Sequence, residues 1–325
     1  MLFVCAFAPA VLAQSVTGFA LPAPGCEPKG IAAGPDRALW FAELYGNNIG
    51  RIASDGTITE FPLPTSSAYP YFITTGPDGA LWFTEVQGNN IGRIATDGTI
   101  TEYPLPNAGT YPYGIAKGPD GALWFTEPHQ NNVGRMGTDG SVKEYPVTTA
   151  DALPTAIAAG PDGALWFTEQ AGNNIGRIGT DGTVTEYAIP TSFATPASIT
   201  LGPDGALWFT EWNSAKIGRI GTDGSILEYP LPVGTTFPYP AGITAGPDGR
   251  LWFTEGPLSG RVGAMSTSGQ LQEYPVPSLG PYAAYPAWMA AGADGAIWFT
   301  EEAGMIGRIS VPGGASAAEV RFHSR

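Results

Sequence analysis

The chain has 325 residues and carries 29 Asp and Glu against 15 Lys and Arg, which gives a formal net charge of −14. This balance argues against nucleic acid as a partner, because phosphates are bound by clusters of Lys and Arg, and the sequence contains no such cluster. After the first residues, no stretch is long and apolar enough to span a membrane.

The first predicted segment is an export signal. Residues 2–13 read LFVCAFAPAVLA and are apolar, with Val11 and Ala13 at the −3 and −1 positions of a cleavage site. We predict that residues 1–13 are a signal peptide, with a truncated start because the positively charged segment is missing, and that the mature chain is extracytoplasmic, either periplasmic or secreted. The alternative is an apolar, disordered terminus. Cleavage would leave Cys26 alone, without a disulfide partner.

A ten-residue phrase dominates the rest of the chain. GPDGALWFTE stands at 76–85, 118–127, 160–169 and 202–211, and near-copies stand at 34–43, 246–255 and 292–301. The tryptophan of each copy falls 42 to 46 residues after the one before it. A fixed period of this length indicates a repeat architecture.

One unit reads as four short strands, at 113–118, 122–127, 132–137 and 141–147 in the third copy. Asp-Gly turns between β-branched and aromatic runs are strong hairpin signals. A four-stranded unit of about 42 residues is typical of a propeller blade. We therefore predict an all-β, seven-bladed β-propeller with four antiparallel strands per blade. It forms one domain over residues 14–314, followed by a tail at 315–325, and we expect a monomer. The alternative is an open solenoid.

The way the ring closes favours the propeller. The seventh unit has no fourth strand after residue 314, whereas SVTGFALP at 15–22 matches TITEYPLP at 99–106 in phase. We predict that the N-terminal strand completes the last blade and so removes an exposed sheet edge.

The repeated motifs GPDGALWFTE, NNIGRI and TDGTITEYPLP resemble those of the virginiamycin B lyase (streptogramin lyase) family over residues 15–310. The resemblance implies a seven-bladed propeller. It also implies an activity, the linearisation of cyclic depsipeptide antibiotics by elimination at the ester, with Mg²⁺ and a histidine base. The scaffold alone does not carry that reaction.

Seven glutamates close the repeated phrase, and antiparallel pairing places them at one face of the ring, where the first strand of each blade begins. They are Glu43, Glu85, Glu127, Glu169, Glu211, Glu255 and Glu301. One interpretation is a carboxylate site for a cation such as Mg²⁺, with Glu301 and Glu255 as its ligands. The alternative is that each glutamate pairs with the arginine of NNIGRI or with backbone N–H groups.

Differences between the copies are more informative about a ligand site. The residue after the proline that opens each blade is expected to face the mouth of the ring; around the ring these residues are Lys29, Tyr71, Tyr113, Thr155, Ala197, Ala241 and Ala287. The two longest loops precede the last two blades. Long aromatic loops on a rigid scaffold favour binding. We predict that a small molecule or peptide binds at a rim made of Tyr71, Tyr113, Phe237, Tyr239, Tyr282, Tyr285 and Trp288. The alternative is neutral drift of surface loops.

The resemblance also implies catalytic positions. It places histidines where Ala241 and Ala287 stand, a glutamate where Tyr285 stands and a tyrosine where Lys29 stands, and it retains Glu301. His129, which follows the phrase in the third copy, is a candidate proton acceptor because its ordinary pKa lies near neutrality; the alternative is an ordinary surface histidine. We therefore expect a ligand-binding propeller without efficient lyase activity. A Mg²⁺-dependent lyase and a structural or protein-binding propeller of the cell envelope are the alternatives.

Overall fold

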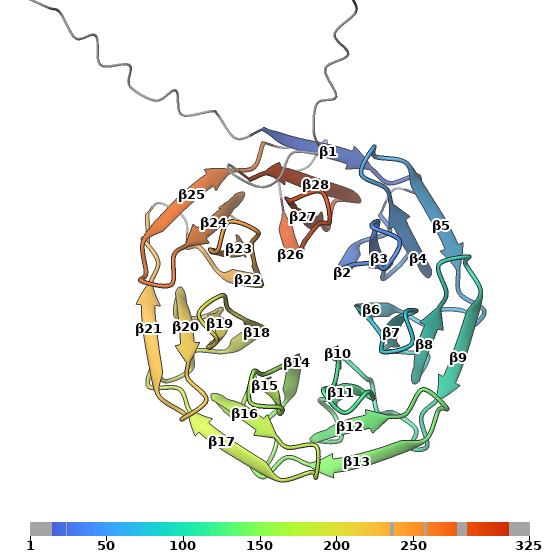
Figure 1. Cartoon of the computed structure of the whole chain (residues 1–325), viewed down its shortest axis with the longest axis horizontal. Helices are drawn as coiled ribbons and strands as arrows, with labels where there is room; N and C mark the ends of the chain where they lie inside the picture. Colours follow the sequence, from blue (N-terminus) through green and yellow to red (C-terminus); the bar gives the residue numbers. More distant parts are fainter. Residues whose placement is uncertain (1–14, 24, 235–236, 257–258, 278–284, 312–325) are drawn as a thin grey trace, which may run out of the picture.

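The computed structural model describes residues 15–23, 25–234, 237–256, 259–277 and 285–311. Within these ranges the chain forms seven four-stranded antiparallel sheets arranged as the blades of a ring (Figure 1). The predicted signal peptide at 1–13 and the tail at 315–325 lie outside the described residues. None of the described residues belongs to a helix that could cross a membrane.

Each blade runs from an inner strand beside the channel to an outer strand at the rim. Blade 1 contains β2 (Pro28–Ala33), β3 (Leu39–Glu43), β4 (Asn48–Ile52) and β5 (Ile58–Pro62). Blade 2 contains β6 (Pro70–Thr75), β7 (Leu81–Glu85), β8 (Asn90–Ile94) and β9 (Ile100–Pro104). Blade 3 contains β10 (Ile115–Lys117), β11 (Leu123–Glu127), β12 (Asn132–Met136) and β13 (Val142–Pro146).

The remaining blades repeat this order. Blade 4 contains β14 (Pro154–Ala159), β15 (Leu165–Glu169), β16 (Asn174–Ile178) and β17 (Val184–Ala188). Blade 5 contains β18 (Pro196–Leu201), β19 (Leu207–Glu211), β20 (Lys216–Ile220) and β21 (Ile226–Pro230). Blade 6 contains β22 (Pro240–Ala245), β23 (Leu251–Glu255), β24 (Arg261–Met265) and β25 (Leu271–Pro275). Blade 7 contains β26 (Pro286–Ala291), β27 (Ala296–Glu301), β28 (Met305–Ser310) and, outermost, β1 (Val16–Ala20).

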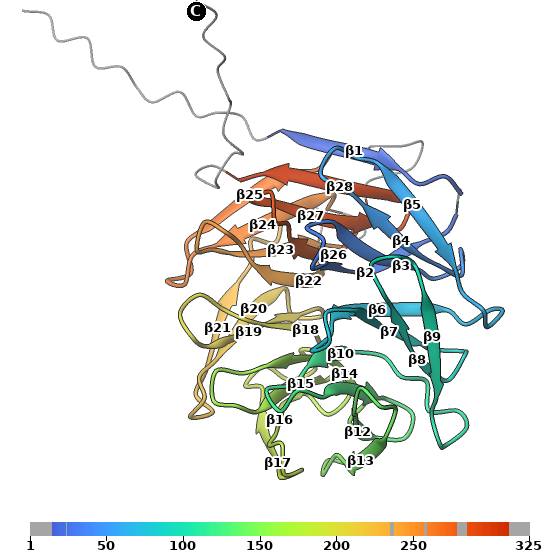
Figure 2. The same cartoon turned by 45° about the vertical axis from the view of Figure 1, so that its right-hand side comes forward.

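The N-terminal strand closes the ring, as the sequence predicted. Strand β1 pairs antiparallel with β28 from Val16 opposite Ile309 to Ala20 opposite Met305. It lies along the outer edge of blade 7 in both face views (Figures 1 and 2). The last blade therefore consists of chain from both ends of the propeller, which excludes the open solenoid.

The hydrophobic core lies between the blades. Seven clusters of buried residues each combine side chains from two neighbouring sheets. In each blade the repeated tryptophan is fully buried. Its ring stacks on an aromatic ring of the outermost strand; Trp82 and Tyr103, for example, have centroids 5.3 Å apart. In blade 7 the partner of Trp298 is Phe19 of β1, at 5.5 Å.

The Asp of the first turn orients this tryptophan. In blade 1 the Asp36 carboxylate accepts a hydrogen bond from the Trp40 indole at 3.0 Å and another from Arg51 Nε at 2.6 Å. The other blades repeat the Asp–Trp bond, and all except blade 6 repeat the Asp–Arg pair. In blade 6 Ala264 stands at the arginine position, and Arg250 binds Asp248 instead.

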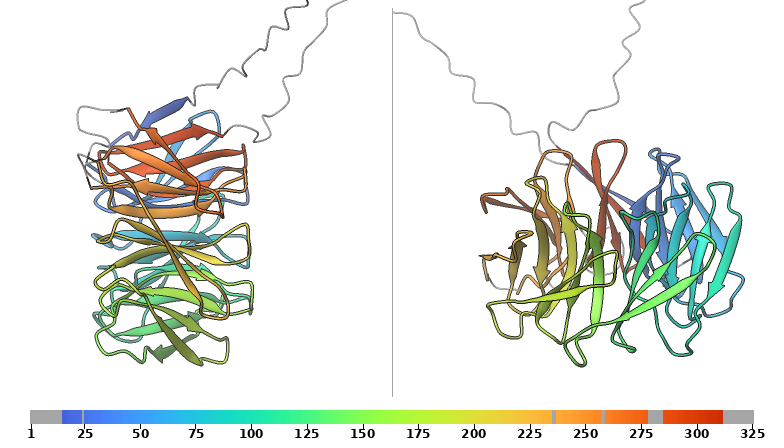
Figure 3. Two further views of the ribbon diagram at one scale, coloured as in Figure 1. Left: turned by 90° about the vertical axis from the view of Figure 1, so that its left-hand side faces the viewer. Right: turned by 60° about the horizontal axis from the view of Figure 1, so that its bottom comes forward.

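Two glycines of the repeat are required by close approach of aromatic rings. A Cβ on Gly34 would stand 2.5 Å from the Trp40 ring, and one on Gly50 would stand 2.2 Å from the Phe41 ring. The Asp, Trp and first Gly of the repeated phrase are therefore explained by the packing of the blades. These residues form part of the stacked blades that Figure 3 shows from the side.

Removing the contacts of the closing strand β1 should destabilise the fold. Phe19→Ala should lower the free energy of unfolding because it removes the ring that covers Trp298, by less than the roughly 3–5 kcal/mol of a fully buried ring since Phe19 is partly buried. Deletion of residues 15–22 should lower it further. Thermal unfolding followed by circular dichroism measures both changes. Phe193→Ala is the matched control, because Phe193 is 84% exposed. Equal melting temperatures for the Phe19 variant and the control would contradict this account of closure.

Candidate functional site

The mouth of the ring is the face at which each inner strand begins and each second strand ends. In blade 5 the N–H of Trp212, directly after the glutamate of the repeat, donates to the carbonyl of Thr195, directly before the opening proline, at 3.2 Å. Five of the other blades repeat this bond. In blade 3 the donor position is Pro128, which has no N–H, and the inner strand there is only three residues long.

The threonine of the repeat fixes the position of the mouth residues. Thr84 Oγ1 donates to the Tyr113 carbonyl of the next blade at 2.8 Å, and Thr210 and Thr254 donate to the carbonyls of Ala241 and Ala287 at 2.7 Å. The carbonyls of these mouth residues are therefore held by buried hydroxyl groups of the preceding blade.

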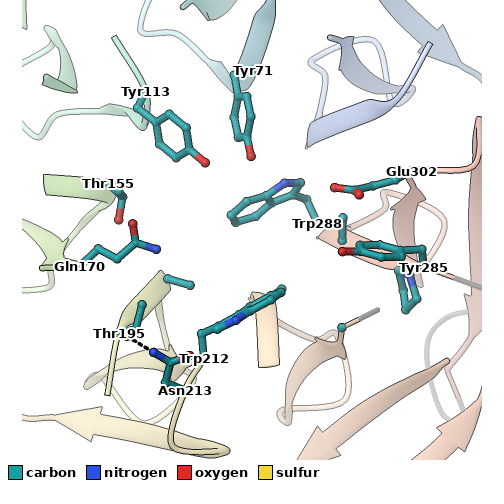
Figure 4. Close-up of a pocket in the computed structure, with 15 residues that line it drawn as sticks. Tyr71, Tyr113, Thr155, Gln170, Thr195, Trp212, Asn213, Tyr285, Trp288 and Glu302 are labelled. Carbon is teal, nitrogen blue, oxygen red and sulfur yellow. Dashed lines mark hydrogen bonds between the residues drawn. The ribbon is translucent and has the colours of Figure 1, made fainter. Parts of the chain in front are cut away.

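A cavity of about 360 Å³ opens at this mouth (Figure 4). Blades 2 and 3 supply tyrosines to one side of it, whereas blades 5, 6 and 7 supply alanines at the same position of the repeat. The residues that line it are Tyr71, Tyr113, Thr155, Gln170, Thr195, Ala197, Trp212, Asn213, Ala241, Gly256, Tyr285, Pro286, Ala287, Trp288 and Glu302. The space exists because four of these residues carry a methyl group or a hydrogen where other blades carry larger side chains.

Aromatic rings form one wall. Trp288 contacts Phe72 with centroids 4.5 Å apart in an edge-to-face arrangement, and Tyr71 lies 4.4 Å from Tyr113. Burial raises the pKa of Tyr71 well above its ordinary value and the pKa of Tyr113 to about 12. Both phenols therefore stay neutral, as hydrogen-bonding groups.

A charged cluster stands beside this wall. The Lys29 ammonium contacts the Glu302 carboxylate and lies 3.2 Å from Glu27. Burial disfavours the charged lysine, but Tyr71, Glu302 and Glu27 together outweigh it and raise the pKa of Lys29. Lys29 is buried, whereas the Glu302 side chain is 28% exposed and lines the cavity.

A second cavity of about 400 Å³ adjoins the first and shares Tyr113, Thr155 and Gln170 with it. His129 lines this second cavity, and its ring lies 4.6 Å from the Tyr111 ring. His129 does not line the first cavity.

The predicted glutamate ring has a different environment from the one expected. The seven side chains are 0–1% exposed and lie inside their own blades. In blades 1, 2 and 4 an asparagine donates to the carboxylate, as Asn90 does to Glu85 at 2.7 Å. The alternative that they pair with the repeat arginines is wrong, because in six blades those arginines bind the turn aspartates.

In six blades a second glutamate, on the outer strand, lies near the buried glutamate and affects its pKa. Burial is the main cause that raises the pKa of Glu85 to about 8, and the charge of Glu102 in β9 raises it further. The other five pairs repeat this in blades 1 and 3 to 6, with values of about 7 or 8. In blade 7 the outer strand carries Gly18 at this position, opposite Gly307, and burial alone raises the pKa of Glu301 to about 7.

The two glutamates predicted as metal ligands are buried. Neither Glu301 nor Glu255 lines the mouth cavity. Nowhere in the part of the chain that the structure describes do three His, Cys, Asp or Glu side chains come together so as to hold a metal ion. The Mg²⁺ that the resemblance implies therefore stays a prediction, and its two expected ligands are buried away from the cavity.

Only some of the residues predicted to form the ligand-binding rim line the mouth cavity. Tyr71, Tyr113, Tyr285 and Trp288 line the cavity. Tyr239 does not line it, but its ring contacts the Trp212 ring in a tilted arrangement with centroids 5.4 Å apart, and the Phe237 ring contacts Tyr239 in the same way at 4.6 Å. Tyr282 lies outside the described residues.

Sequence reasoning missed the residues directly after the repeated glutamate. Gln170, Trp212, Gly256 and Glu302 all line the cavity. The acidic group at the cavity is therefore Glu302 and not Glu301. The signal was present in the sequence, because this is the first variable position after an otherwise repeated phrase.

The family profile described as the virginiamycin B lyase family matches residues 11–111, 87–240 and 235–322, which is nearly the whole propeller. The chain belongs to the virginiamycin B lyase family. No curated protein matches the chain.

Solved structures of this family are similar over almost their whole length. A virginiamycin B lyase from Staphylococcus aureus is 40% identical, with 92% of this chain and 99% of that chain covered and a TM-score of 0.86. A streptogramin B lyase structure is 38% identical, with coverage of 93% and 99% and a TM-score of 0.87. A catalytically inactive histidine-to-alanine variant of the Staphylococcus aureus enzyme, solved with quinupristin, is 40% identical over 92% and 99%, with a TM-score of 0.86.

The buried glutamates predict a pH dependence of stability. Their pKa values lie near 4.5 in the unfolded chain and at about 7 to 8 in the folded chain. The folded state therefore binds more protons between these values, and the stability that the glutamates contribute is lost as pH rises through the folded pKa values. Chemical denaturation should give a higher free energy of unfolding at about pH 5 than at about pH 8.5.

Replacing one of these groups should reduce the slope. Glu85→Gln keeps an acceptor for Asn90 but removes the titration, so stability should fall less steeply with pH than in the unmodified chain. If stability rose across this range, or if the variant kept the full slope, the buried, protonated glutamates would be refuted.

Proposed function

We propose that this chain is a ligand-binding propeller of the virginiamycin B lyase family, with the mouth cavity as its binding site. The observation that carries the proposal is the asymmetry of the mouth, where tyrosines on blades 2 and 3 face alanines on blades 5 to 7 across a cavity of about 360 Å³. Such a volume, with aromatic walls and a few polar groups, is typical of small-molecule sites. We also propose that the protein is exported, with residues 1–13 as its signal peptide.

A lyase that opens a cyclic depsipeptide is the second candidate. It is favoured by the 40% identity to a virginiamycin B lyase over 92% of this chain. Against it, Ala241 and Ala287 stand where the resemblance implies histidines, and the described lining of the cavity contains no histidine. General-base catalysis contributes typically 10²–10⁴-fold, so we expect no efficient elimination.

Tryptophan fluorescence tests binding. The chain has nine tryptophans. Seven are fully buried in the core, whereas Trp212 and Trp288 line the cavity. Quinupristin, which was present in the related structure, is the probe. We expect a saturable change in emission that decreases when Trp212 and Trp288 are replaced by Phe. An unchanged emission in titration and no heat in calorimetry would count against the cavity as a site for this ligand class.

Chromatography with fragmentation tests the lyase on the same probe, because elimination leaves the mass of the ring unchanged while hydrolysis adds water. With Mg²⁺ in the buffer, we expect quinupristin to remain cyclic. Turnover on the order of 1 s⁻¹, within the ordinary enzyme range, would establish the second candidate and reject the first.

A further inference from the structure

The charged groups at the mouth cavity indicate which class of ligand it would bind. Among the described residues that line it, Glu302 is the one acidic or basic side chain apart from three tyrosines, and the raised pKa values of Tyr71, Tyr113 and Tyr285 keep these phenols neutral. The carboxylate of Glu302 is directed toward Trp288 (Figure 4). The space beside the aromatic wall therefore has an anionic group on one side.

Lys29 does not cancel this charge. Its ammonium is shared between Glu302 and Glu27, at 3.2 Å from Glu27, so the three groups together keep a net charge of −1. Lys29 is buried, with a side chain only 8% exposed, which leaves Glu302 as the charged group that a ligand in the cavity meets. The chain as a whole, with its net charge of −14, adds to the attraction of a cation toward the mouth.

The aromatic wall already accepts a cation from one side. The Lys29 ammonium lies 5.8 Å from the centroid of the Tyr71 ring, within the range of a cation–π contact. The centroids of the Tyr71 and Trp288 rings are 6.3 Å apart, and Trp288 also contacts Phe72 edge to face. Trp288 lines the cavity. Trp212 lines the cavity on blade 5. Its position depends on Gly256, where a Cβ would stand 3.2 Å from the Trp212 ring and 2.8 Å from the Tyr239 carbonyl oxygen.

We propose that the mouth cavity selects an organic ammonium ligand, held between the Trp288 and Trp212 rings with its positive charge beside the Glu302 carboxylate. Aromatic faces and a carboxylate are the combination that recognises alkylated ammonium groups. This inference rests on the proposed function and deepens it, because it names the class of ligand for the same cavity.

A pair of isosteric probes tests the charge alone. The (4-hydroxyphenyl)trimethylammonium ion and 4-tert-butylphenol have the same shape and differ by the positive charge. By titration calorimetry at low salt we expect the cation to bind at least about tenfold more tightly, and to weaken with added salt because exposed charges are screened. Equal affinities would overturn the ammonium preference while leaving the cavity as a ligand site. Failure of both probes to bind would overturn the preference as well, and the quinupristin titration would then decide the proposed function separately.

Variants of the charged cluster should move the affinity in opposite directions. E302Q removes the carboxylate that the ligand meets and should reduce the preference for the cation to about twofold or less. K29Q leaves two uncompensated carboxylates and should strengthen cation binding severalfold. Asp97→Asn is the matched control, because it changes the net charge as much as E302Q in a turn at the opposite end of its blade; it should leave both affinities unchanged. A cation preference that survived E302Q, or that fell equally in the control, would refute the assignment to Glu302. If K29Q does not fold, E302Q and the isosteric pair still decide the proposal.

Discussion

The burial of one tryptophan per blade between two neighbouring sheets is the constraint on which the rest of the structure depends. The indole needs a flat aromatic partner on its own outer strand, a carboxylate for its N–H and a glycine beneath its ring. Tyr103, Asp78 and Gly76 provide these for Trp82. A single sheet cannot enclose such a ring, so the blades stabilise one another, and at the last interface Phe19 of β1 covers Trp298.

This constraint separates the residues that fold the chain from those that are free to bind. The threonine and glutamate that end the repeated phrase are buried, and the threonine holds the carbonyls of the next inner strand. The next residue along the chain already lines the mouth. A scaffold that repeats nearly the same backbone from blade to blade can therefore carry a different side chain at each mouth position, which is how Tyr71 and Ala241 stand at equivalent places.

The ring could be predicted from the sequence because the repeat encodes local turns and a period. Its closure could be predicted because residues 15–22 match, in phase, the fourth strand that the last unit lacks. The environment of the glutamates could not be predicted from the sequence, because it depends on which side chain lies beside each carboxyl group in the folded blade. Arg93 binds Asp78 across neighbouring strands, so the expected pair with Glu85 never forms. The Lys29–Glu302 contact joins residues 273 positions apart, and no local pattern indicates it.

The central claim is that function resides in the space left by the small mouth residues and not in the repeated ones. Ala241→Tyr tests it most directly, because it places in blade 6 the side chain that blades 2 and 3 carry at the same position. Calorimetry with the (4-hydroxyphenyl)trimethylammonium ion, together with the melting temperature, gives the answer. The account predicts that binding is lost while the melting temperature stays within a few degrees; unchanged affinity in a folded variant would contradict it.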